Sequence, residues 1–130
     1  MDVTVRKTSS LKKSILAMLV AIFLCFFLLF FTVDRVCNNS IKQWLPYYPA
    51  AKVISENHNF FRPQGMGLTV ITLGSEDDPE VVRQFYRDNT LAMMRGGVSR
   101  GLAALDSRVE PDPDNVGGSL IYLYSECGQN

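Results

Sequence analysis

The stretch ILAMLVAIFLCFFLLFFTV, residues 15–33, decides how the rest of the chain is organised. It holds nineteen residues without a charge, and fourteen of them are Leu, Ile, Val or Phe. As an α-helix it would be about 28 Å long, close to the thickness of the bilayer hydrocarbon. Each of these apolar side chains favours membrane insertion by about 0.3 to 0.6 kcal/mol. The stretch therefore predicts a transmembrane helix, which we place at residues 15–36.

A cleaved secretory signal is the alternative for this segment. Signal cores hold about 7 to 15 apolar residues and end at a small-residue A-x-A site. Here the apolar run is longer, and it exits through FFTVD at residues 30–34, which offers no such site. We therefore expect an uncleaved anchor.

The predicted span has two different faces. Small side chains recur every fourth residue at Ala17, Ala21 and Cys25, and this spacing lets a second helix approach closely. The alternative is chance, because Ala and Cys are common in spans. Nearly opposite lies an aromatic face at helical spacing, made of Phe23, Phe26, Phe27, Phe30 and Phe31. That face would meet lipid, a second protein, or flat apolar cofactors such as pigments or quinone held by a partner.

Charge is distributed unevenly along a chain whose formal net charge is zero. Residues 1–14 carry four basic side chains against Asp2, whereas residues 34–130 carry nine basic and twelve acidic side chains. The positive-inside rule predicts that the short tail, 1–14, is cytoplasmic and that the C-terminal domain is extracytoplasmic. We accordingly expect a bacterial inner-membrane protein with a periplasmic domain. A mildly acidic domain without a basic cluster argues against nucleic-acid binding.

Two of the three cysteines, Cys37 and Cys127, lie on the side that we predict to be oxidising, where disulfides persist. A Cys37–Cys127 bridge would tie the end of the chain back to the membrane exit. Free thiols are the alternative.

Residues 37–49 form the predicted connector between span and domain. Trp44, Tyr47 and Tyr48 stand beside Pro46 and Pro49 in this segment, and such aromatic side chains settle at the headgroup level of a bilayer. The alternative is that the same rings pack into the core of the domain.

Residues 50–130 predict a small α+β domain of three or four mostly antiparallel strands with one packed helix. Residues 67–73, GLTVITL, and 119–126, SLIYLYSE, are alternating, β-rich strands, and 50–55 reads as a short first strand. Residues 56–64 read as a polar turn. A helix is expected from Pro79 to about Met94, capped by Asp78 and ended by Gly96–Gly97. Residues 98–109 fit either a helix or a strand.

No set of residues with a known catalytic or metal-binding spacing is present in the sequence. His58 is the only histidine, and a lone exposed histidine is usually just solvated. No Cys-x-x-Cys pair occurs, which excludes the common zinc and iron–sulfur spacings and covalent c-type haem attachment. The acidic residues Glu76, Asp77, Asp78 and Glu80 suit a helix N-terminus better than a calcium loop. We therefore predict no enzyme activity, no catalytic residues, and no metal or cofactor bound by the chain's own motifs.

YYPAAKV at 47–53, LTVITLG at 68–74 and DDPEVVRQFYRD at 77–88 resemble a pattern in small bacterial single-pass membrane-anchored domains. In those domains a "YPGA" segment, a "T-x-T" strand and a "D-x-PEEV-x-x-FYR" helix follow one another. The resemblance covers residues 46–90 and departs at Ala50, where those domains have glycine. It implies an anchored domain without a catalytic set.

These observations predict a non-catalytic, single-pass accessory subunit of a larger bacterial membrane complex. An energy-converting assembly, photosynthetic or respiratory, is the host class that we expect, with lipids and other transmembrane subunits as partners. The alternative is a free-standing, membrane-anchored binding or sensing module with a pocket near Trp44, Tyr47, Phe60 and Phe61.

Overall fold

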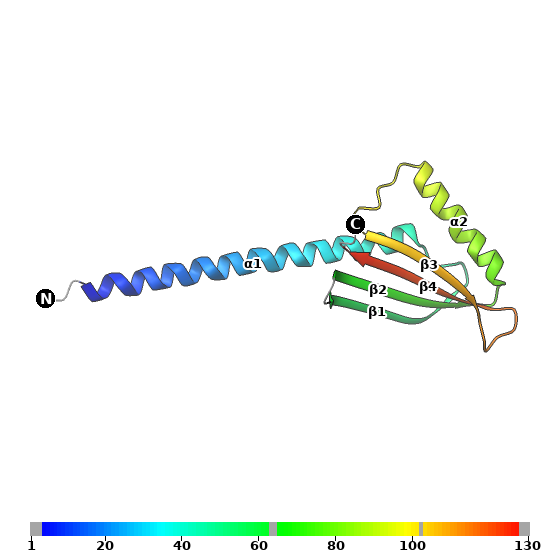
Figure 1. The fold of residues 1–130 in the computed structure, drawn as a ribbon, viewed down its shortest axis with the longest axis horizontal. Helices are drawn as coiled ribbons and strands as arrows, with labels where there is room; N and C mark the ends of the chain where they lie inside the picture. Colours follow the sequence, from blue (N-terminus) through cyan, green and yellow to red (C-terminus); the bar gives the residue numbers. More distant parts are fainter. Residues whose placement is uncertain (1–3, 63–64, 102, 128–130) are drawn as a thin grey trace. The chain divides into compact units, whose positions relative to one another are not determined.

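A computed structural model of the chain describes residues 4–62, 65–101 and 103–127. Within these residues it contains, in chain order, α1 (Thr4–Trp44), β1 (Lys52–Arg62), β2 (Gly65–Ser75), α2 (Pro79–Arg95), β3 (Ala103–Pro111) and β4 (Ser119–Cys127) (Figure 1). The chain divides into two compact units, Met1–Val33 and Asp34–Asn130, and α1 is continuous through their boundary.

The first unit holds the N-terminal part of α1, including its apolar stretch. Its side chains from Leu11 to Thr32 are exposed all round the helix. The segment Leu11–Trp44 is long and apolar enough to cross a membrane, by length and composition. By length and composition, the predicted span at 15–36 therefore lies in a helix suited to a bilayer.

The second unit contains a four-stranded sheet in the order β1-β2-β4-β3 (Figure 1). Each neighbouring pair is antiparallel, and α2 provides the crossover from β2 to the far edge strand β3. This arrangement confirms the predicted α+β class. The end of α1, from Asp34, belongs to this unit, so most of the expected connector at 37–49 is helix within the domain.

The two faces of the sheet differ in what covers them. On one face, which we call the helix-covered face, Ile71 and Leu73 of β2 and Ile121 and Leu123 of β4 are fully buried. They form the core together with Val109 of β3 and five helix or connector residues: Ile41, Trp44, Leu45, Val82 and Tyr86. On the other face, the open face, the alternating residues of β2 and β4 are half-buried: Leu68, Val70, Thr72, Gly74, Leu120, Tyr122, Tyr124 and Glu126.

Helix α2 begins and ends at the residues that the sequence indicates. The Asp78 carboxylate accepts a hydrogen bond from the backbone N–H of Glu80 at 2.8 Å, and Pro79 occupies the first turn. At the other end Gly97 has φ +67°, and the N–H groups of Gly97 and Val98 donate to the carbonyls of Met94 and Met93. This Schellman motif needs the left-handed conformation that glycine supplies.

Residues 56–62, expected in a polar turn, instead belong to the edge strand β1, which pairs with β2 over nearly its whole length. Glu, Asn and His have little intrinsic strand preference, but backbone pairing with β2 outweighs it, and polar side chains suit an exposed edge. The ambiguous stretch at 98–109 contains the start of β3 at Ala103, so its second half is a strand.

The turn before β1 carries a residue in an unfavourable conformation. Ala51 donates its N–H to the Tyr48 carbonyl at 3.0 Å, and Ala50, at the third position of this turn, has φ +65°. A left-handed alanine costs about 1 to 2 kcal/mol, part of which glycine would recover. We expect Ala50→Gly to raise the free energy of unfolding by about 0.5 kcal/mol, measured by denaturant titration of the full chain in detergent. Ala51→Gly, whose backbone has no positive φ, should lower it; equal effects of the two changes would contradict this explanation.

Tyr86 should make the stability of the domain depend on alkaline pH. Its side chain is buried, its hydroxyl makes no hydrogen bond of good geometry, and desolvation raises its pKa to about 12 from 10.0. Between these values the folded chain keeps a proton that the unfolded chain has lost, so stability falls as pH rises. We expect a loss of about 2 kcal/mol across this window relative to Tyr86→Phe, measured from denaturant midpoints of both chains. The idea fails if the two chains show the same pH dependence.

Candidate functional site

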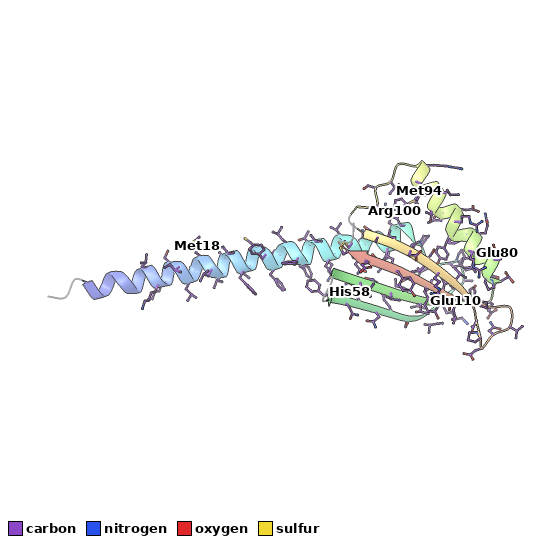
Figure 2. The ribbon with its side chains drawn as sticks, viewed as in Figure 1. Met18, His58, Glu80, Met94, Arg100 and Glu110 are labelled. Atoms are coloured by element: carbon purple, nitrogen blue, oxygen red, sulfur yellow. A yellow bond between two sulfur atoms is a disulfide. The ribbon has the colours of Figure 1, made fainter. Side chains whose placement is uncertain are left out.

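A buried polar cluster joins the domain's part of α1 to β1 and β2. The Asp34 side chain is only 8% exposed, and its Oδ2 lies 3.2 Å from Nε2 of His58. Nδ1 of His58 lies 2.7 Å from Oγ1 of Thr69, and that hydroxyl donates to Oδ1 of Asn38 at 3.2 Å. We call these four residues the Asp34–His58 cluster; Figure 2 labels His58 on β1.

The hydrogen bonds determine what this cluster can do chemically. Because the Thr69 hydroxyl donates its proton to Asn38, its oxygen is left to accept a hydrogen bond from Nδ1 of His58 when that nitrogen carries a proton. Thr69 is 1% exposed, so its oxygen is neither free nor accessible to a substrate. Although an acid, an imidazole and a hydroxyl follow one another as in a catalytic triad, the arrangement suits attachment of the helix to the sheet rather than nucleophilic catalysis.

Removing His58 should leave the Asp34 carboxylate buried without its partner. We expect His58→Ala to lower the free energy of unfolding by about 1 to 2 kcal/mol, less than for a fully buried pair because His58 is 32% exposed. In an Asp34→Asn background the same change should cost under about 1 kcal/mol. Glu80→Ala, which breaks the exposed Glu80–Arg83 pair, is the matched control and should have little effect. Equal costs of His58→Ala in both backgrounds would show that the pair does not matter.

A disulfide lies beside this cluster. Cys37, on the same helix as Asp34, is joined to Cys127 at the end of β4, with the two Cα atoms 5.8 Å apart. Both residues are almost fully buried. The bond links residues 90 positions apart, whereas Cys25 is exposed and free.

The two faces predicted for the span are not covered by other described parts of the chain. Ala17, Ala21 and Cys25 are exposed, as are all five phenylalanines of the aromatic face. The docking of a second helix on the small-residue face is therefore still a prediction.

The connector aromatics take different places, although the sequence groups them as interfacial. Trp44 is 3% exposed and lies in the core, with its indole N–H donating to the Ser99 carbonyl at 3.3 Å and the Arg100 guanidinium 5.1 Å from its ring centre. Tyr48 is half-buried against Phe85, and its hydroxyl donates to Asp77. Tyr47 is the one of the three that is exposed, at 39%. The core packing of Trp44 follows because α1 continues as helix through it and turns its ring toward the sheet.

Of the four residues near which a pocket was expected, Trp44 and Tyr47 line two separate cavities, and the side chain of Phe61 lies outside the described residues. Trp44 lines a cavity of about 180 Å³ with Thr90 and Arg100, and Tyr47 lines another of about 340 Å³ with Lys42 and Pro46. A larger cavity of about 550 Å³ lies beside Lys52, at the start of β1 and away from the Asp34–His58 cluster. Its polar and charged lining includes Lys52, Glu76, Asp77, Asp112 and Asn115.

Three of the acidic residues at the start of α2 have partners of their own. Asp78 caps the helix, Asp77 accepts from Tyr48, and Glu80 accepts from Arg83 at 2.7 Å. Among the described residues no group of three His, Cys, Asp or Glu side chains could hold a metal ion.

Sequence reasoning missed the Asp34–His58 cluster. Asp34 and His58 are 24 residues apart, and the stretch around His58 looks like a solvated turn when read alone. The imidazole of His58 comes close to Asp34 of α1 because His58 pairs with Thr69 across β1 and β2. The chain matches no protein-family model, no curated protein and no solved structure.

Proposed function

We propose that this chain is a non-catalytic, single-pass subunit of a larger membrane complex, with its domain on the extracytoplasmic side. The observation that carries the proposal is that one helix has an exposed apolar segment at 15–32 and continues without a break into the core of a folded domain. An apolar surface of that extent needs lipid or another protein around it.

The disulfide and the charge distribution support the orientation. Disulfides persist in oxidising compartments, and the basic tail at 1–14 favours the cytoplasm. The polar cluster supports a non-catalytic role, because its hydroxyl is buried and its protons are used in binding the helix to the sheet.

A binding or sensing module that works alone is the second candidate. The observation in its favour is the cavity of about 550 Å³ at the loop end of the sheet, which is of a size that small ligands occupy. Its charges of both signs would suit a zwitterionic ligand.

The test is what co-purifies with the tagged chain in mild detergent, read by native gel and mass spectrometry. Migration with a large assembly at fixed stoichiometry supports the subunit role. The co-purifying proteins would also identify the host, for which we propose an energy-converting assembly, because the aromatic face suits flat apolar cofactors held by a neighbour. Migration alone would overturn the subunit role, and a ligand screen on the full chain would then test the second candidate.

A variant pair sharpens this experiment. Ala21→Ile adds bulk to the small-residue face and should release the chain from its host. Leu19→Phe adds bulk nearly opposite and should leave the chain bound. If Ala21→Ile is retained as well as the wild type, the small-residue face is not the docking surface.

A further inference from the structure

The open face of the sheet carries an apolar centre that no helix of this domain covers. Both helices contribute to the core on the other face. Antiparallel sheets often expose one face to water, but that face is then usually polar. Here β2 and β4, the two central strands, present Leu68, Val70, Leu120, Tyr122 and Tyr124, all half-buried, with the two tyrosine rings stacked at 6.5 Å.

Strand register fixes how this face is laid out. Four residues, one from each strand, form a row across the sheet. In the order β1, β2, β4, β3, the rows are Lys52–Gly74–Leu120–Glu110, then Ser55–Thr72–Tyr122–Arg108, then Asn57–Val70–Tyr124–Asp106. Small or slender side chains on β2 thus stand beside large ones on β4 in these three rows. In the fourth row, Asn59–Leu68–Glu126–Ala104, Leu68 stands beside the charged Glu126.

We propose that this open face is the interface of a homodimer, in which two copies pack sheet against sheet about a two-fold axis parallel to the strands. Such an axis places β2 of one copy over β4 of the other and β1 over β3. Each row then packs against the same row of the second copy, with the order of the four strands reversed. This proposal goes beyond the role as a subunit and does not depend on it.

The reversed rows are complementary in size and in charge. Thr72 and Val70 lie opposite Tyr122 and Tyr124 of the second copy, so large side chains meet smaller ones there. In the row of Leu120, the Ile54 side chain already covers Gly74. At the sheet edges Lys52 lies opposite Glu110 of the second copy, twice by symmetry, and can join the pair that Glu110 makes with Arg108 at 2.8 Å. Arg108 faces Ser55 and Asp106 faces Asn57, so no like charges lie directly opposite each other in these three rows. Figure 2 labels Glu110 on β3.

Geometry and area also suit this dimer. Strands of about 30 Å, four abreast at about 4.8 Å, offer nearly 600 Å² per copy, and the total passes the roughly 1,000 Å² of a specific interface. The two-fold axis keeps both Asp34 residues, where the domain begins, at the same end of the dimer. Both copies can therefore be anchored in one membrane.

The test uses the full chain in detergent, with its mass measured by light scattering. The wild type should be a dimer. Lys52→Glu and Glu110→Lys should each weaken association about tenfold, whereas the double swap should restore it. Arg87→Glu, on α2, is the control and should leave the dimer intact. A monomeric wild type, or a dimer that neither charge reversal weakens, would overturn the proposal.

A cross-linking variant excludes association through the span. In a Cys25→Ala background, Thr72→Cys should give a covalent dimer with a short bismaleimide, because the two Thr72 positions would flank the axis. Arg87→Cys in the same background should give none. The dimer should also persist in the Ala21→Ile variant. If Ala21→Ile abolishes the dimer, and Thr72→Cys and Arg87→Cys cross-link equally, the chains associate through the span instead.

Discussion

Removal of the Cys37–Cys127 disulfide is expected to cost about 4 kcal/mol of unfolding free energy. The bond links residues 90 positions apart, and a closed loop of that length strongly restricts the unfolded chain. Because both sulfurs are buried, Ala at the two positions also leaves a small cavity. Trp44, the only tryptophan and a core residue, reports unfolding by its fluorescence.

The measurement compares the wild type with the double variant Cys37→Ala, Cys127→Ala in the same detergent. Cys25→Ala is the matched control, since Cys25 is exposed and free, and it should change stability by less than about 0.5 kcal/mol. A reducing agent should shift the wild type to the midpoint of the double variant and leave that variant unchanged. If the double variant unfolds at the wild-type midpoint, the bond contributes nothing to the domain.

The helices and central strands of this fold can be predicted from the hydrophobic periodicity and from the helix-capping residues in the sequence. The uncharged run at 15–33, the alternation in β2 and β4, and the Asp78–Pro79 and Gly97 signals at the ends of α2 each depend on residues close together in the chain. Local patterns of this kind survive in the fold because tertiary contacts favour the same conformation.

The parts that the sequence does not predict depend on partners far away in the chain. β1 is a strand because β2 pairs with it, although its residues 55–59 are polar. Trp44 is in the core because α1 continues past the membrane exit, whereas composition alone allows an interfacial position equally well. Ala50 shows a further case, because only the backbone reveals that this position is left-handed.

One end of the sheet concentrates the contacts that hold the domain to its part of α1. The disulfide fixes β4 to the helix, the Asp34–His58 contact fixes β1, and the Thr69–Asn38 hydrogen bond fixes β2. Three strands are thus attached to a little more than one helical turn, Asp34 to Asn38. Replacing a residue that contacts more than one of these attachments should therefore lower the free energy of unfolding by more than its small side chain suggests.

Gly67 is that residue, and we expect Gly67→Ala to lower the free energy of unfolding by about 3 kcal/mol. Gly67 has φ +62° and lies where the pairing of β2 with β4 shifts register, as glycine does in many β-bulges. A methyl group there would lie 2.8 Å from Oδ1 of Asp34 and 3.3 Å from Cβ of Cys127. Asp34 cannot yield easily, because its other oxygen is held by His58.

Gly97→Ala separates the two causes, because Gly97 has nearly the same φ, +67°, but nothing lies within 4 Å of the added methyl group. Its cost should be the backbone strain alone, about 1 kcal/mol. Combining Gly67→Ala with Asp34→Ala should recover part of the difference, since the closest atom is then gone. Denaturant titrations of the four chains, followed by Trp44 fluorescence, measure these costs. If Gly67→Ala and Gly97→Ala lower the free energy of unfolding equally, backbone strain alone explains the need for glycine at residue 67. The close approach of Asp34 and Cys127 would then contribute nothing.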